Sequence, residues 1–155
     1  MRAVIQRVAQ AQVCVEKNIK GKIGRGFLIL LGIESSDTEK EAVILAEKIV
    51  KLRVFSDDNG KMNLSLLDFQ SCENPYRVLV ISQFTLYACC RHGNRPDFLA
   101  AARPESANAL YEKFISLIKE KNIGVETGVF GADMSVSLIN DGPVTIILDT
   151  KDLKS

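Results

Sequence analysis

The sequence predicts an α+β domain built on an antiparallel sheet or barrel with two main helices. The chain has 155 residues, the size of one domain, so residues 1–155 are expected to fold as a single unit. About eight segments have the apolar pattern of strands, and two have that of amphipathic helices. The strand-like segments gather toward the two ends of the chain instead of alternating regularly with helices, which is typical of α+β proteins.

Strands are expected over most of the N-terminal region. Apolar and polar side chains alternate over residues 1–9, and residues 12–16 have the pattern of a second short strand. Turns are expected around Ile23, because residues 20–26 hold several glycines among charged side chains. Residues 27–33 form a continuous apolar run, which indicates a strand buried on both faces.

Two helices are expected in the central part of the chain. The first begins after Asp37 or Thr38, where Thr38 and Glu41 have the spacing of a capping box, and it ends near residue 52. The second begins at Pro104, because proline suits the first position of a helix. Both segments carry apolar residues at i, i+3 and i+4 spacing, so each helix should bury one face.

Another buried strand is expected over residues 77–82, between the two helices. The last strands are expected over residues 125–130, 134–139 and 144–148. Residues 140–143 (NDGP) combine turn-forming residues, and we expect them to join the final two strands as a hairpin.

Composition argues against several classes of protein. Twenty lysines and arginines oppose nineteen aspartates and glutamates, so the net charge of +1 does not indicate a nucleic-acid or membrane partner. The longest apolar run, residues 27–33, is far shorter than the ~20 residues of a membrane-spanning helix. Gln6 and Arg7 interrupt any signal-peptide core. The four cysteines lack a CxxC or zinc-ligand spacing, so we expect a cytoplasmic protein without membrane association.

No common catalytic motif is present. A Ser-His-Asp triad would need the single histidine, His92, as its base, but no carboxylate lies beside it in the sequence. A solvated or phosphate-contacting loop residue is therefore the favoured interpretation of His92. There is no glycine-rich phosphate loop and no GxSxG motif, and the turn at residues 57–60 lacks the glutamate of a calcium loop. We expect no metal and no cofactor.

Two segments have residues that are unusual for the structure expected there, and they remain as candidates for a catalytic or binding site. Polar side chains crowd the end of an apolar strand at residues 82–86 (SQFTL), where backbone N–H groups become free to bind a ligand. A proline interrupts the expected hairpin at residues 140–145 (NDGPVT), although proline cannot donate to a strand ladder. From the residues alone, a plain strand-to-loop transition and a plain turn are the favoured interpretations.

At these two segments the chain resembles the D-aminoacyl-tRNA deacylases, the D-tyrosyl-tRNA(Tyr) deacylase family. The resemblance includes MRAVIQRV at the N-terminus and RHGNRPDF at residues 91–98, and it extends in order over the whole chain. The spellings Ser82-Gln83 and Gly142-Pro143 point to the D-amino-acid-specific branch rather than to the animal paralogue of the family.

The resemblance implies an enzyme that hydrolyses the ester between a D-amino acid and tRNA, and that also removes glycine from mischarged tRNA. It implies a homodimer of small barrel-like subunits whose substrate is the 3′ end of an aminoacyl-tRNA. It implies no metal or cofactor, because a 2′-hydroxyl of the RNA assists hydrolysis. Two competing hypotheses are a module that binds nucleic acid without turnover and a metal-dependent or thiol hydrolase.

The family also implies a chiral filter at the second segment. The Gly142-Pro143 peptide would be cis and would enter the partner subunit's pocket, where its carbonyl oxygens bind the α-amino group of the substrate. An L side chain would then collide with this backbone, whereas a D side chain or glycine would pass. Arg7 matches the arginine that buttresses the motif, and Met134 is implied to line the same pocket.

The first segment would form the opposite wall of the pocket, through Ser82, Gln83, Phe84 and Thr85. Thr85 is a candidate nucleophile, but no base is evident near it, so a positioning role is favoured. The backbone N–H groups of Phe84 and Thr85 would stabilise the oxyanion.

A basic loop follows the first segment. Arg91, His92 and Arg95 are implied to contact tRNA phosphates, with a solvated surface loop as the alternative. The chain departs here from the commonest family spelling. Cys89-Cys90 replaces small or acidic residues, and His92 replaces a lysine.

Overall fold

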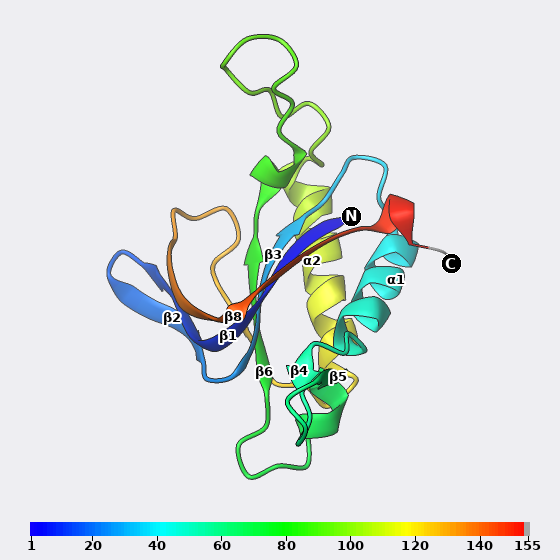
Figure 1. The fold of residues 1–155 in the computed structure, drawn as a ribbon. Coiled ribbons are helices and arrows are strands. Elements are labelled where there is room, and N and C mark those ends of the chain that lie inside the picture. Colours follow the sequence, from blue (N-terminus) through cyan, green and yellow to red (C-terminus); the bar gives the residue numbers. More distant parts are fainter. Residues whose placement is uncertain (154–155) are drawn as a thin grey trace.

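A curved six-stranded sheet carries two helices on one face in the computed structural model, which describes residues 1–153 (Figure 1). A small two-stranded sheet, β4–β5, lies apart from it. The strands are β1 (Arg2–Val15), β2 (Asn18–Ile23), β3 (Gly26–Gly32), β4 (Phe55–Ser56), β5 (Met62–Leu64), β6 (Arg77–Ser82), β7 (Val125–Thr127) and β8 (Ser135–Asp149). The helices are α1 (Glu39–Val50) and α2 (Pro104–Lys119), with 3₁₀ turns η1 (Leu66–Phe69), η2 (Phe84–Tyr87) and η3 (Thr150–Asp152).

The sheet is built around β1. One edge of β1 pairs antiparallel with β8, and its other edge pairs with β3 and, further along, with β2. The order β2-β1-β3-β6-β7 continues from there, and β2 also contacts β6 and β7, so the sheet nearly closes into a barrel. The predicted α+β class and its barrel-like sheet with two helices are confirmed.

The sequence predicts an antiparallel sheet, whereas the sheet in the structure is mixed. Strand β6 runs parallel to β3 and to β7. The physical reason is connection length, because parallel neighbours need a crossover, and the chain supplies α1 between β3 and β6 and α2 between β6 and β7. The central part of the chain therefore does alternate strand and helix, which the clustering of strands at the ends obscured.

Both helices begin where the sequence indicates. The Thr38 hydroxyl accepts a hydrogen bond from the backbone N–H of Lys40, and the Glu41 carboxylate accepts one from the N–H of Thr38. This arrangement is a capping box. Pro104 occupies the first turn of α2, where its missing N–H removes no intrahelical bond.

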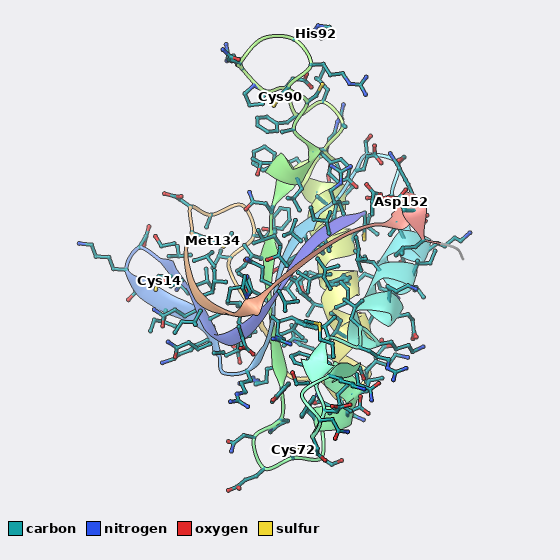
Figure 2. All side chains as sticks on the ribbon, viewed as in Figure 1. Cys14, Cys72, Cys90, His92, Met134 and Asp152 are labelled. Carbon is teal, nitrogen blue, oxygen red and sulfur yellow. The ribbon has the colours of Figure 1, made fainter. Side chains whose placement is uncertain are left out.

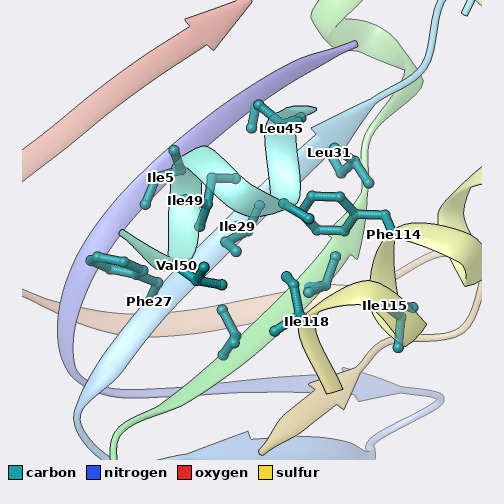
Figure 3. Packing of buried hydrophobic residues seen from close by; sticks show 14 of the residues in the cluster. Ile5, Phe27, Ile29, Leu31, Leu45, Ile49, Val50, Phe114, Ile115 and Ile118 are labelled. Atoms are coloured by element: carbon teal, nitrogen blue, oxygen red, sulfur yellow. The ribbon is translucent and has the colours of Figure 1, made fainter. Parts of the chain in front are cut away.

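The main core lies between the sheet and the two helices (Figure 3). Phe114 of α2 and Ile49 of α1 are both fully buried against β3, whose Ile29 and Leu31 point to the same side. A second, smaller cluster fills the inside of the curled sheet and includes Val13, Leu79 and Ile81. Strand β3 contributes Ile29 and Leu31 to the main core and Leu28 to the second cluster, which confirms the prediction that it is buried on both faces.

The N-terminal part of the sheet holds longer strands than predicted. Residues 2–9 and 12–15 of two predicted strands lie in the one strand β1, and its turn into β2 is made by Glu16 and Lys17, both at positive φ. Residues 20–23, expected in a turn, belong to β2.

The C-terminal hairpin expected at residues 140–143 does not form. In β8, Thr145 pairs with Gln6 and Asn140 pairs with Val8, so residues 141–144 all stand opposite Arg7. The chain bulges outward there and continues in the same direction. A bulge accepts proline because its residues do not donate to the ladder.

Among residues 1–153, no helix is long and apolar enough to cross a membrane.

Candidate active site

A pocket of about 580 Å³ opens where β6 ends. Its wall combines the ends of β3 and β6 with residues 98–107, which lead into α2, and residues 130–136, which lead into β8. Most of the lining side chains are apolar, with a few polar groups among them. Concave, largely apolar sites of this kind are where small molecules and terminal groups of larger ligands bind.

The wall at the end of β6 is formed by Ser82, Gln83 and Phe84. The backbone N–H of Gln83 donates to the Leu31 carbonyl oxygen over 2.8 Å, which extends the β3–β6 pairing by one residue. The chain then turns into η2, and the Phe84 ring is left 58% exposed. This ring meets Phe98 edge to face, with 5.1 Å between the centroids. The pair places two aromatic surfaces at the pocket.

Thr85 lies just outside this pocket, on an exposed part of η2. Its hydroxyl oxygen accepts a hydrogen bond of 2.6 Å from the side-chain amide of Gln83. An amide nitrogen cannot remove a proton, so this contact does not activate Thr85 as a nucleophile.

Two backbone N–H groups beside the pocket have no backbone acceptor. They belong to Phe84 and Thr85, and within residues 1–153 neither donates to a carbonyl oxygen. They are free because the first N–H groups of a helical turn have no intrahelical partner. Such groups can bind an oxygen that develops negative charge.

Met134 forms part of the opposite wall, on the segment that connects β7 with β8 (Figure 2). Its sulfur packs directly over Gly128, where any added Cβ would collide with it. The absence of a side chain at Gly128 therefore leaves the space that Met134 occupies.

Arg7, Gly142 and Pro143 lie together, but they do not line this pocket. The Arg7 side chain is only 9% exposed, and its Nε donates to the Asp141 carbonyl oxygen over 3.0 Å. Its Nη1 donates to the Val54 carbonyl oxygen over 2.5 Å. Gly142 and Pro143 are exposed, and the peptide bond between them is cis. Arg7 thus holds the bulge of β8 from inside while its outer surface faces solvent.

The basic loop extends away from the sheet, with His92 near its far end (Figure 2). Cys89 and Asp97 exchange backbone hydrogen bonds of 2.8 and 3.0 Å, which close the base of the loop. Arg91, His92 and Arg95 are all exposed, and none of them lines the pocket. All four cysteines of the chain, including Cys89 and Cys90, are free thiols.

No three histidine, cysteine, aspartate or glutamate side chains of residues 1–153 gather into a group that could hold a metal ion.

Residues 4–149 match the family model described as D-Tyr-tRNA(Tyr) deacylase. The chain belongs to this family. It is 55% identical over 150 residues to a D-aminoacyl-tRNA deacylase of Clostridium botulinum, covering 97% of each chain. It is also 55% identical over 152 residues to one of Thermus aquaticus, covering 98% of this chain and 97% of the relative. A solved structure titled c-Myc DNA Unwinding Element Binding Protein superposes with a TM-score of 0.87 at 42% identity, over 96% and 98% of the two chains.

Within this deacylase-family chain, the predicted site residues fall into three groups. Ser82, Gln83, Phe84 and Met134 meet at the pocket, with Thr85 beside them. The Arg7–Gly142–Pro143 group lies on the β8 bulge, and the three basic residues lie on the loop. Sequence reasoning missed Phe98 and Phe130 as lining residues. The signal for Phe98 was an aromatic residue inside an otherwise polar, turn-rich loop.

Proposed function

We propose that this protein hydrolyses the ester bond of D-aminoacyl-tRNA and releases the free D-amino acid and tRNA. The observation that carries the proposal is the match over 97% of the chain to proteins named D-aminoacyl-tRNA deacylase. The apolar pocket with two free N–H groups at its rim gives this reaction a place to occur.

The pocket is proposed to hold the aminoacylated 3′ end of the tRNA. Its volume of about 580 Å³ lies within the usual range for sites that enclose a small ligand. Phe84 and Phe98 present ring surfaces on which a nucleobase can stack. The exposed side chains of Arg91, His92 and Arg95 would contact phosphates farther along the acceptor strand, because that loop projects beyond the pocket.

Hydrolysis is proposed to proceed by attack of water on the ester carbonyl carbon. The carbonyl oxygen becomes an oxyanion, which the N–H groups of Phe84 and Thr85 would stabilise. The bond between the carbonyl carbon and the ribose oxygen then breaks. The proton lost by the water reaches the departing ribose oxygen through the neighbouring 2′-hydroxyl of the RNA. This route suits a site in which Thr85 is bound by an amide and positions the substrate.

Chiral selection is proposed to come from a second copy of the chain. In a homodimer, Gly142 and Pro143 of one subunit would enter the other subunit's pocket and bind the α-amino group through their carbonyl oxygens. An L side chain would then point into this backbone, a D side chain would point away, and glycine would be accepted. Support comes from the exposure of the bulge and from its absence from the pocket of its own chain.

The outer edge of β8 supports the same proposal. Within residues 1–153, β8 pairs only with β1, so its other edge is free. Ile139 and Ile147 on this strand are 53% and 67% exposed. A long free edge with apolar side chains is a surface that natural proteins usually cover.

The test is deacylation of matched D-tyrosyl-, L-tyrosyl- and glycyl-tRNA by the purified protein, with and without a chelator. Rapid loss of the D-tyrosyl and glycyl esters, with the L-tyrosyl ester decaying only at its spontaneous rate, is expected. Hydrolysis of no ester would favour a nucleic-acid-binding module. Equal hydrolysis of the D and L esters would contradict the chiral filter, and loss of activity with the chelator would contradict the RNA-assisted route.

A further inference from the structure

The side chain of Arg2 joins three parts of the chain that are far apart in sequence. Its Nη1 donates to the Leu86 carbonyl oxygen over 2.7 Å, at the end of η2. Its Nε and Nη2 donate to the same Asp149 carboxylate oxygen over 3.0 and 2.9 Å. Its guanidinium carbon lies 4.9 Å from the centre of the Tyr87 ring. One side chain of β1 therefore contacts both the last residues of η2 and the end of β8.

The sheet register explains why these groups meet. Arg2 pairs with Asp149 of β8 on one side and with Gly32 of β3 on the other. These three residues form one row across the sheet, and η2 lies against that row. A Cβ added at Gly32 would lie 2.9 Å from the Leu86 Cβ and 3.1 Å from the Gln83 carbonyl oxygen. The turn that carries Phe84 and Thr85 thus packs directly against Gly32 and is hydrogen-bonded by Arg2.

This turn needs an external anchor. It is a single 3₁₀ turn of four residues, and short 3₁₀ segments have poor hydrogen-bond geometry. Its own backbone bonds include 3.3 Å from Leu86 N to Gln83 O and 3.1 Å from Ala88 N to Thr85 O. The carbonyl groups at the end of a helical turn lack intrahelical partners, and Arg2 supplies one for Leu86.

We propose that Arg2 is a positioning residue for the hydrolysis, because its guanidinium fixes η2 and thereby the pocket wall formed by Ser82, Gln83 and Phe84. This inference rests on the proposed function. Arg2 does not line the pocket, so it acts through η2 rather than on the substrate. A small displacement of groups that orient a reacting ester lowers the rate far more than it lowers binding.

The arrangement requires an arginine rather than a cation in general. Three guanidinium nitrogens are used at once, two on Asp149 and one on Leu86. The planar guanidinium holds these donors in a fixed fork, whereas a lysine ammonium is a point charge on a flexible stem. Although burial disfavours the charged Asp149 carboxylate, the Lys151 backbone N–H and the Arg2 guanidinium bring its pKa below the ordinary value. Asp149 therefore stays an anionic partner at neutral pH.

The test compares Arg2→Ala and Arg2→Lys with a control, Arg77→Ala, in steady-state deacylation of D-tyrosyl-tRNA. Arg77 is a fair match, because its side chain is 41% exposed against 36% for Arg2, it pairs with Glu126 over 2.6 Å, and it lies at the opposite end of β6. For both Arg2 variants we expect kcat to fall by about ten- to a hundred-fold, with KM within about twofold of wild type. Arg77→Ala should retain wild-type kcat.

Added guanidinium ion provides a readout that a loss of stability would not produce. Guanidinium can occupy the space left in Arg2→Ala, because the site is partly open to solvent. It should raise the kcat of Arg2→Ala several-fold and leave Arg77→Ala unchanged, whereas ammonium ion should have no effect. If Arg2→Ala does not fold, the Arg2→Lys variant carries the comparison, with melting temperature measured alongside.

The outcomes distinguish a failure of the proposed function from a failure of the positioning role of Arg2. If the wild-type protein hydrolyses no aminoacyl-tRNA, the proposed function is wrong and the role of Arg2 falls with it. If the wild type is active and the folded Arg2 variants keep its kcat, the positioning role alone is wrong. Full activity of Arg2→Lys would show that charge suffices, which would also overturn the proposal.

Discussion

Gly32→Ala should slow deacylation, because the added methyl group pushes η2 away from the end of β3. The Cβ would lie 2.9 Å from the Leu86 Cβ, about 0.6–1.1 Å closer than the ~3.5–4.0 Å at which carbon atoms pack well. It would also lie 3.1 Å from the Gln83 carbonyl oxygen, a backbone atom that cannot rotate aside. The turn as a whole must therefore move by a large fraction of an ångström.

The expected magnitude follows from this displacement. Misplacement of reacting groups by about 1 Å can lower a rate by about a hundred-fold, so we expect the single-turnover rate constant of deacylation to fall by about ten- to a hundred-fold. Inserting a methyl group into a filled space also destabilises a protein by roughly 1–3 kcal/mol. A lower melting temperature should therefore accompany the slower reaction.

The assay is single-turnover deacylation of D-tyrosyl-tRNA by wild type, Gly32→Ala and Gly24→Ala. Gly24 is the matched control, because no atom lies within 4 Å of its added Cβ and its φ is not positive. Gly24→Ala should react at the wild-type rate. A folded Gly32→Ala protein that hydrolyses the ester as fast as wild type would refute the argument that the close contact between η2 and Gly32 sets the rate.

Three further outcomes are expected. Thr85→Val should retain more than about a tenth of the wild-type kcat, because a positioning hydroxyl is removed, whereas a loss of a thousand-fold or more would identify a nucleophile. Gly142→Ala should lower the ratio of D- to L-tyrosyl-tRNA hydrolysis, since φ is +134° and the new Cβ would lie 2.8 Å from the Val144 Cγ2. Hydrogen bonds from Lys121 and Lys51 lower the pKa of Glu47 from 4.5 to about 2. The stabilisation from this carboxylate is therefore present above pH 4.5 and lost as the pH falls toward 2. Measured by thermal unfolding, the free energy of unfolding of Glu47→Gln should vary less with pH over that window than that of wild type. The difference should be less than about 1 kcal/mol, because these ion pairs are exposed.

Features that depend on neighbouring residues could be predicted from the sequence. The capping box of Thr38 and Glu41, the start of α2 at Pro104 and the bounds of β6 all agree with the structure. Each arises from contacts within a few residues along the chain, so the local pattern contains the cause. The number of helices and the α+β class follow from the same local signals.

Pairing between distant segments could not be predicted in this way. Periodicity indicates that a segment is extended, but it does not indicate which strand supplies its hydrogen-bond partners. The pattern therefore did not distinguish a hairpin at residues 140–143 from a bulge in one continuous strand opposite Arg7. It likewise did not reveal that β3, β6 and β7 are parallel.

The candidate site likewise has features that the sequence predicts and features that depend on the tertiary structure. By itself, the sequence determined the family and the residues worth testing, because the motifs at 82–86 and 140–145 are specific and local. Only the tertiary structure decided that Ser82, Gln83 and Phe84 share a pocket with Met134 and Phe98 while Gly142 and Pro143 lie elsewhere. Only the sheet register brought Arg2, Gly32 and Asp149 into one row against η2. The physical reason is that such contacts depend on which backbones pair, and side-chain identity constrains that pairing only through the whole fold.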